Sequence, residues 1–156
     1  MMAVGGAEGF KYLDHMTDAV IEAYGTNLES AFENSARGLV NVMFDISKVI
    51  PQKEIMIEAS GYDLPSLLYD WLEKVMLVIL TQYVVLSDFK VKILNTKLEG
   101  SNAENSYSLS AYTKGESMNL EKHDYKVEIK GVTYHEMQIL QPIDKNQVTI
   151  RFMLDL

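Results

Sequence analysis

The sequence predicts an α+β domain in which a mainly antiparallel β-sheet packs against two main helices. Two stretches repeat apolar residues at spacings of three and four, as helices do, and most of the remaining stretches alternate apolar and polar residues, as half-buried strands do. The order along the chain is strands and a helix, a strand and a helix, then a run of strands. That order is typical of the α+β class.

The first half of the chain contains two short strands, a helix and a third strand. Residues 9–15 and 18–25 are expected as strands, the second of which stops at Gly25. Thr26 and Glu29 have the spacing of a capping box and predict a helix over residues 26–44. Seven residues fall on one face of this helix: Leu28, Ala31, Phe32, Ser35, Leu39, Val42 and Met43. Alternation over residues 53–61 then predicts a strand.

The second helix has the clearest pattern in the chain. Asp63 suits the N-cap position, and Pro65 is tolerated in a first helical turn. The apolar stripe consists of Leu64, Leu67, Leu68, Trp71, Leu72, Val75, Met76 and Ile79. Strands are expected over residues 89–100, 106–115, 125–140 and 147–156, with turns at Gly100 and Gly115 and a hairpin loop over residues 142–147.

Length and composition indicate one globular domain. The 156 residues suit a single domain over residues 9–156, preceded by a disordered tail over residues 1–8. The net charge of −8 argues against direct binding to nucleic acid or to an anionic membrane, and leaves a basic protein as a possible partner. The absence of cysteine excludes disulfides and thiolate zinc sites.

The longest apolar run, residues 75–86, is interrupted by Thr81 and Gln82 and is too short to span a bilayer. It fits a buried helix that runs into a strand. Because no signal peptide is recognised at the N-terminus, a soluble cytoplasmic protein is expected.

Asp14, His15 and Asp18 interrupt the strand-like pattern near the N-terminus. Aspartate often caps turns, and a histidine beside carboxylates is often a neutral ring that they orient. This spacing alone therefore leaves a structural role open for all three.

The last strand carries a second acidic feature. Ile150, Phe152 and Leu154 alternate, so this strand is expected to be buried on one face up to Leu154, with Asp155 on the opposite face. The α-carboxylate of Leu156 follows directly. If Asp18 lies nearby, three acidic groups converge, and a divalent cation bound through oxygen is their natural neutraliser. The alternative is that these carboxylates are simply solvated.

A third group of polar residues lies on the strand-like segment that contains Lys130, Thr133 and His135. Alternation places Thr133 and His135 on the same face as Gly131, and a bulge at Gly131 would alter that parity. Lys130 is a surface charge, a partner of the acidic cluster or a contact with another protein. A zinc site built from His15, His123 and His135 stays open, although no HExxH spacing supports it. No P-loop, nucleophile elbow or nucleophile–base signature is found, so catalysis by this chain alone is unsupported.

Over about residues 9–156 the chain resembles the archease family. The resemblance rests on several motifs in the family's order: YLDHMTDAVIEAYG, LESAFENSARGLVNVM, DLPSLLYDWLEKVM, the Gly115–Glu116 pair, IKGVTYH and the terminal LDL. It implies an archease-like α+β fold with a strand–helix–strand–strand insertion.

The resemblance also implies a function. Archeases assist the GTP-dependent RNA ligase of tRNA splicing, which joins 2′,3′-cyclic-phosphate or 3′-phosphate ends to 5′-hydroxyl ends. The helper is not an enzyme itself; it promotes guanylylation and multiple turnover of the ligase, and contacts RNA only indirectly. The family's metal ligands fall on Asp18, Asp155 and Leu156. Contacts with the partner, or a role in activation, fall on Asp14, His15, Lys130 and His135.

The implied cofactor is a divalent cation. Oxygen ligands favour calcium, with magnesium or manganese as alternatives. A monomer or weak oligomer is expected. The chain departs from the family pattern at Met16, Thr17, Glu73 and Gly131, none of which is an expected ligand. Two alternative functions stay open. The protein could be a chaperone-like adaptor in RNA processing whose metal site is purely structural, or a metal-dependent hydrolase of small phosphate esters.

Overall fold

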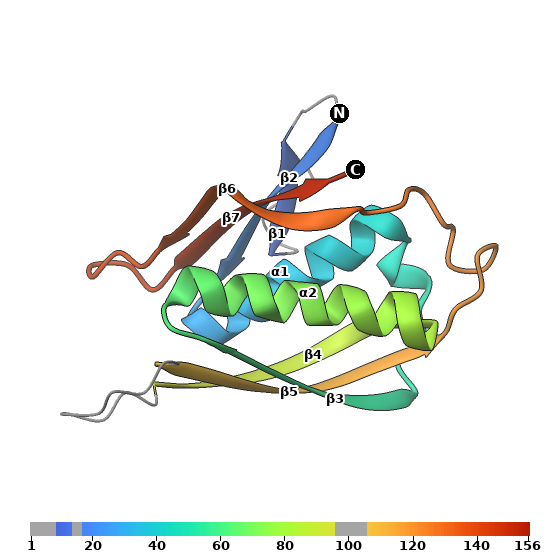
Figure 1. Cartoon of the computed structure of the whole chain (residues 1–156), viewed down its shortest axis with the longest axis horizontal. Coiled ribbons are helices and arrows are strands. Elements are labelled where there is room, and N and C mark those ends of the chain that lie inside the picture. The colour runs from blue at the N-terminus through green and yellow to red at the C-terminus, as the bar shows by residue number, and fades with distance from the viewer. Residues whose placement is uncertain (1–8, 14–16, 96–105) are drawn as a thin grey trace.

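Two helices form a layer between two antiparallel sheets (Figure 1). The computed structural model describes residues 9–13, 17–95 and 106–156. Its elements are β1 (Phe10–Leu13), β2 (Asp18–Gly25), α1 (Leu28–Met43), the short 3-10 helix η2 (Ile46–Lys48), β3 (Lys53–Gly61), α2 (Leu64–Gln82), β4 (Val84–Asn95), β5 (Tyr107–Ser117), β6 (Gly131–Leu140) and β7 (Val148–Asp155). The expected α+β class is therefore confirmed.

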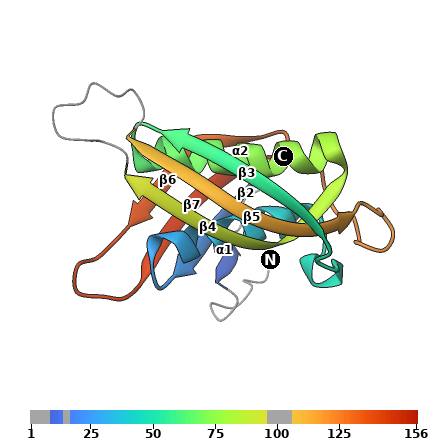
Figure 2. The ribbon, with the colours of Figure 1, turned by 90° about the horizontal axis from the view of Figure 1, so that it is seen from below.

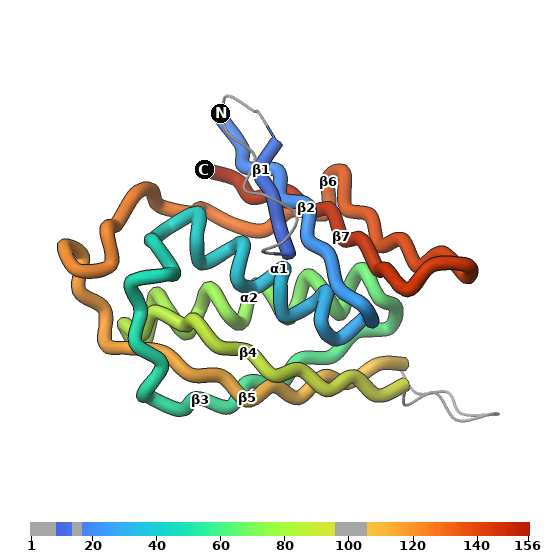
Figure 3. Tube along the Cα trace, turned by 180° about the vertical axis from the view of Figure 1, so that it is seen from behind, coloured from blue at the N-terminus to red at the C-terminus, as the bar shows by residue number. Residues whose placement is uncertain are grey.

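The two sheets differ in how the chain builds them. Sheet A has the strand order β1-β2-β7-β6, which pairs the first strands with the last ones. Sheet B has the order β3-β5-β4 and is built from one continuous part of the chain, β3–α2–β4–β5, which is the expected strand–helix–strand–strand unit. Figure 3 shows the same layers from behind, with α1 and α2 between the sheets.

The core is centred on Trp71 of α2. This side chain is fully buried, its indole Nε1 donates a hydrogen bond to the carbonyl of Phe32 in α1 at 3.0 Å, and its ring meets Phe89 of β4 edge-on. Burial of the predicted α2 stripe is confirmed, with only Leu64 partly exposed. Among the described residues, neither helix is both long enough and apolar enough to cross a bilayer.

The helix starts follow capping chemistry, although the predicted cap of α1 was wrong. Asn27 is the N-cap, and it exchanges hydrogen bonds with Ser30 in a capping box. Glu29, which the sequence assigned to the cap, instead accepts a hydrogen bond from the Ile93 amide of β4 at 2.9 Å. Asp63 caps α2 as predicted, with Ser66 as its reciprocal partner. The box that caps α1 is therefore formed one position after the predicted Thr26–Glu29 pair, whereas the cap of α2 is the predicted one.

Two predicted boundaries in the second half were wrong. Gly115 is not at a turn but inside β5, where it pairs with both Lys53 and Leu86. A Cβ at this position would lie 2.2 Å from the carbonyl oxygen of Val85, so the close approach of β4 requires glycine. Residues 125–130 are not a strand, and β6 begins at Gly131. Gly100 and the tail of residues 1–8 lie outside the described residues. The hairpin between the last two strands is confirmed.

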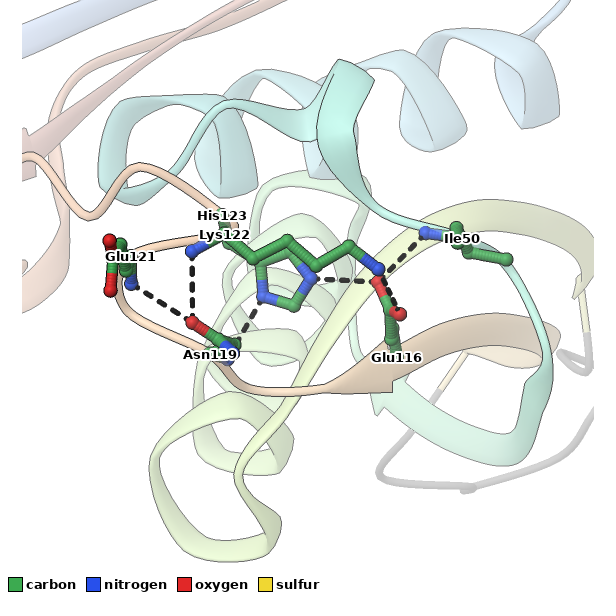
Figure 4. Close-up of polar contacts among 6 residues, drawn as sticks. All are labelled: Ile50, Glu116, Asn119, Glu121, Lys122 and His123. Atoms are coloured by element: carbon green, nitrogen blue, oxygen red, sulfur yellow. Dashed lines mark hydrogen bonds and ion pairs between the residues drawn. The ribbon is translucent and has the colours of Figure 1, made fainter.

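The connection from β5 to β6 is held by a polar network around Glu116 (Figure 4). The Glu116 carboxylate accepts hydrogen bonds from Lys122 Nζ, from His123 Nε2 at 2.8 Å and from the Ile50 amide at 3.1 Å. His123 is fully buried, and its Nδ1 accepts the Asn119 amide at 3.1 Å, which leaves Nε2 as the donor to Glu116. These contacts lower the pKa of Glu116 from 4.5 to about 2, with the Lys122 hydrogen bond as the largest cause.

The same connection is attached to the end of α1 and then to the end of β7. The Asp45 amide donates to the His123 carbonyl, and the Lys126 amide donates to the Met43 carbonyl, both at 2.8 Å. The Lys130 amide then donates to the Asp155 carbonyl at 2.7 Å. Backbone hydrogen bonds therefore tie this connection to α1 at its middle and to β7 just before β6 begins.

The two glycines of contrasting surroundings give a matched stability test. Gly115→Ala should lower the free energy of unfolding by about 1–3 kcal/mol, because its methyl group has no room against β4. Gly131→Ala should leave that free energy unchanged or raise it by up to about 1 kcal/mol, since no atom lies within 4 Å of its Cβ. Urea unfolding measures both. Equal destabilisation by the two substitutions would contradict the pairing of β5 with β4.

Glu116 should make folding stability depend on acidic pH. Its carboxylate binds its proton more weakly in the folded chain than in the unfolded chain. The stabilisation is therefore present above about pH 4.5 and is lost as the pH falls towards 2. The difference in urea midpoint between the wild type and Glu116→Gln should accordingly shrink as the pH is lowered from 5 to 2. Glu128→Gln, which changes an exposed carboxylate outside the network, is the control. A difference that stays constant with pH would refute this role of Glu116.

Candidate functional site

The candidate site lies where the first and last strands of sheet A meet. β2 and β7 pair antiparallel along their whole lengths, with Asp18 directly opposite Asp155. One position further on, the Leu156 amide donates a hydrogen bond to the Thr17 carbonyl at 3.3 Å. Figure 1 shows β2 and β7 side by side, with the C-terminus just beyond the end of β7. Two of the expected site residues are thus cross-strand neighbours, and the third follows one of them.

The hydrogen bonds show that Asp18 and Asp155 form a closely spaced pair. Thr17 and Leu156 are joined by a backbone hydrogen bond, and hydrogen-bonded and non-hydrogen-bonded pairs alternate in an antiparallel ladder. Asp18 and Asp155 therefore form a non-hydrogen-bonded pair, in which opposed Cβ atoms are about 4.5–5.5 Å apart. Consistent with this, the Asp155 carbonyl points the other way and accepts the Lys130 amide of the neighbouring chain segment.

Both aspartates lie on the face of sheet A that the helices do not cover. Leu154, which alternates with Asp155 along β7, is fully buried against the core, whereas Asp155 is exposed and Asp18 is half-buried. Gly131 of β6 is the next residue in the same cross-strand row, and nothing lies within 4 Å of where its Cβ would be. The space above Gly131, next to Asp155 in this row, is therefore open.

Leu156 lies next to this row, and its side chain attaches it to the core. Its partly buried side chain packs against the hydrophobic core. Together with Asp18, Tyr12 and Lys126 it lines a hollow of about 240 Å³ near the end of α1. Because its amide is bound to Thr17 and its side chain is packed, the position of its backbone relative to Asp18 is fixed. The contact between Thr17 and Leu156 was not predicted from the sequence, since only the strand register reveals it.

Glu22, an acidic residue on the same face of sheet A, differs from Asp155 because basic side chains neutralise it. Glu22 contacts Arg151 at 3.0 Å, Lys11 at 3.4 Å and the Tyr24 hydroxyl. Burial raises the pKa of Glu22, but the hydrogen bonds from Tyr24, Arg151 and Lys11 outweigh it and lower that pKa overall. Within the described part of the chain, the Asp155 side chain has no ion pair of this kind.

The other predicted residues are arranged less regularly. Lys130 is exposed and lies directly before β6, with its backbone bound to Asp155. The alternation expected for His135 fails, because β6 bulges between Thr133 and Gln138, where Glu136 has a left-handed φ of 60°. His135 is exposed in this bulge, with its amide bound to Thr133 Oγ1 at 3.0 Å. The sequence had suggested a bulge at Gly131, but the bulge lies between Thr133 and Gln138.

A three-histidine zinc site gains no support from this arrangement. His123 is buried in the Glu116 network with both ring nitrogens occupied. Asp14 and His15 lie outside the described residues. Among the residues that are described, no three His, Asp or Glu side chains form a cluster suited to a metal ion. The side chains in the row that carry carboxylates are those of Asp18 and Asp155. Oxygen donors of this kind suit hard cations such as calcium and magnesium.

Comparison with known proteins identifies relatives across nearly the whole chain. The archease protein family (MTH1598/TM1083) matches residues 10–156. The protein archease of Thermococcus kodakarensis is 38% identical over 130 residues, which are 83% of this chain and 87% of the relative. The protein archease of Sulfolobus acidocaldarius is 36% identical over 147 residues, which are 94% of this chain and 98% of the relative.

The fold has a counterpart among solved structures. The solution structure of protein 1598 from Methanobacterium thermoautotrophicum superimposes with a TM-score of 0.78 at 36% sequence identity, and the match covers 96% of this chain and 99% of that one. Together with the family match over residues 10–156, these similarities show that the chain belongs to the archease family.

Proposed function

We propose that this protein is a non-catalytic, metal-dependent activator of the GTP-dependent RNA ligase of tRNA splicing. The proposal has two supports: membership of the archease family, and the register that sets Asp18 opposite Asp155 beside Leu156. The register is the observation that carries it. The ligase performs the chemistry, and the activator promotes its guanylylation and its multiple turnover.

The proposed metal ligands are the side chains of Asp18 and Asp155 and the α-carboxylate of Leu156. Two like charges placed directly opposite each other on neighbouring strands are unfavourable, and a bound cation turns this repulsion into attraction. Calcium is the proposed ion, because it accepts six to eight oxygen ligands with irregular geometry; magnesium and manganese are the alternatives. When bound, the ion supplies positive charge to which anionic groups of the partner can be drawn.

The proposed partner is a protein with a basic surface around its active site. The chain carries a net charge of −8, and opposite potentials accelerate association and fix orientation. Lys130 lies beside the carboxylate row because its backbone is bound to Asp155, so we assign its exposed side chain to the contact with the ligase. Asp14, His15 and His135 are assigned to the same contact, and RNA is engaged only through the ligase.

Metal binding should reverse the effect of an aspartate substitution on stability. In excess chelator, Asp155→Asn should raise the free energy of unfolding by up to about 1 kcal/mol, because it removes the cross-strand repulsion. At a calcium concentration about 100 times the dissociation constant, the wild type should gain about 2.7 kcal/mol and the variant should gain nothing. Thermal unfolding with and without calcium measures both changes.

Three further variants, two at the proposed site and one control, test the calcium response. Asp18→Asn should also abolish the gain with calcium, and so should a glycine added after Leu156, because it moves the terminal carboxylate by one residue. Asp144→Asn changes an exposed aspartate in the loop between β6 and β7 and should retain the gain. A full calcium response in Asp155→Asn would remove this residue from the site.

A ligation assay separates activation from a purely structural metal. With the ligase at sub-stoichiometric concentration over RNA, the wild type and Asp144→Asn should support many turnovers per ligase. Asp18→Asn and Asp155→Asn should reduce the turnover number at least tenfold, while circular dichroism in chelator stays like that of the wild type. Normal stimulation by variants that no longer bind calcium would favour the alternative, a chaperone-like adaptor in RNA processing whose metal only stabilises the fold.

A further inference from the structure

The two edge strands of sheet B differ in whether their outward-facing backbone amides have hydrogen-bond partners. On β4, the outward-facing amides of Val91 and Ile93 donate to the carboxylates of Glu33 and Glu29 in α1, each at 2.9 Å. The helix therefore occupies the hydrogen-bonding groups that an additional strand would need. An edge closed in this way cannot pair with another chain without first losing those two hydrogen bonds.

The other edge, β3, is closed only at one end. The Ser60 amide donates to the Asp70 carboxylate of α2 at 2.9 Å, which shows that the Ser60 amide points away from β5. Because the direction of backbone groups repeats every second residue in a strand, the amides and carbonyls of Glu58 and Met56 point outward as well. In the described part of the chain, no hydrogen-bond partner is found for the amides of Met56 and Glu58.

Apolar surface lies on both sides of this open edge. Figure 2 shows α2 behind and beside β3, on the side away from β5. Between them is a groove of about 240 Å³, lined by Met56, Ile57, Glu58, Lys74, Leu77, Val78, Thr81 and Gln82. Met56 is 62% exposed on the outer face of the sheet, and Leu77 is 45% exposed on α2. An added strand would cover Met56 with one face and Leu77 with the other.

The charges beside the edge indicate which strand would fit. On the outer face Met56 is flanked by Glu54 and Glu58. Glu54 has Lys114 as its neighbour on β5, but the neighbour of Glu58 is Ser110. The lysine in the groove, Lys74, is paired with Asp70 at 3.2 Å. No ion pair of Glu58 is found among the described residues, so Glu58 can attract a basic residue placed opposite it on an added strand.

We propose that the free edge of β3 binds an extended segment of a partner protein as a fourth strand of sheet B. On the outer face this segment presents an apolar residue opposite Met56, with a lysine or arginine two positions before and after it. The residues between them are apolar and face Leu77. Backbone hydrogen bonds supply the affinity and the alternating side chains supply the specificity, as in other cases of strand addition. The site is independent of the carboxylate row, which lies in the other sheet.

A second copy of the chain is the less suitable occupant. In an antiparallel pair of β3 strands centred on Met56, Glu54 of each copy would lie opposite Glu58 of the other, and opposed like charges are unfavourable. Each copy also carries a net charge of −8. The edge is therefore better matched to a basic strand than to itself.

The test uses the synthetic peptide acetyl-Thr-Lys-Val-Leu-Val-Lys-Thr-amide as the probe, with the full chain labelled for NMR. The peptide should bind with a dissociation constant below about 1 mM and should shift the amide signals of Met56 and Glu58 most strongly. The same peptide with glutamate in place of both lysines should not bind. Failure of the lysine peptide to bind, or equal binding of the two peptides, would overturn the proposal.

Variants of the protein locate the binding to the edge. Glu58→Lys should weaken binding about tenfold, because attraction to the peptide becomes repulsion. Asp88→Lys makes the same change of charge on β4 and should leave the affinity nearly unchanged. Met56→Pro removes the central donor at an edge position that tolerates proline, and should abolish binding. Equal weakening by the two lysine substitutions would show that only net charge matters. A dimer of the free chain that Met56→Pro dissociates would show that a second copy occupies the edge, and would overturn the proposal.

Discussion

The antiparallel pairing of β2 with β7 is the constraint on which the rest of sheet A depends. Ile21 and Phe152 are partners in this ladder and are both fully buried, so the helices cover one face of the pair. A shift of one residue would move Ile21 and Phe152 to the outer face, so their burial in the core fixes the register. Once it is fixed, Asp18 and Asp155 must lie opposite each other on the outer face.

The acidic residues of this chain serve three distinct purposes. Glu22 and Glu116 are neutralised by neighbouring basic groups and join separate segments of the chain. Glu29, Glu33 and Asp70 reach from the helices to the amides of edge strands in sheet B. Asp155, by contrast, faces another aspartate across the ladder. The net charge of −8 is thus more than a contribution to solubility, because several of these carboxylates hold defined positions.

Local patterns in the sequence predicted the elements better than they predicted their contacts. Asp63 and the apolar stripe around Trp71 located α2 correctly, because the cap and the helical period are both local signals. The predicted cap of α1 was wrong by one residue, because Asn27 and Ser30 form the capping box, and Glu29 binds the Ile93 amide of β4. Gly115 resembles a turn residue, and only the proximity of Val85 explains why it lies inside a strand. The Glu116 network was missed, since its members lie in an irregular connection without a periodic signal.

At the candidate site, too, the local pattern was predicted from the sequence and the contacts between strands were not. Alternation correctly placed Asp155 on the face opposite Leu154, but no periodicity could show which residue of β2 lies opposite it. Asp18 was noted because it interrupts a strand-like pattern, and the resemblance to archeases then predicted it as a metal ligand. The strand register places it opposite Asp155. The bulge after Thr133, which determines where His135 lies, depends on a mismatch between β6 and β7 that neither strand reveals alone.

The topology of sheet A also has a consequence for folding kinetics. β4 and β5 pair across a short stretch of chain, from Asn95 to Tyr107, whereas Asp18 and Asp155 are separated by more than ten times as many residues. Because the entropy of loop closure rises with the logarithm of loop length, bringing β2 to β7 from the unfolded chain costs about 2 kcal/mol more than closing β4 onto β5. Contacts of such long range are slow to form, so the contiguous β3–α2–β4–β5 unit has a kinetic advantage. We therefore expect the carboxylate row to form after sheet B.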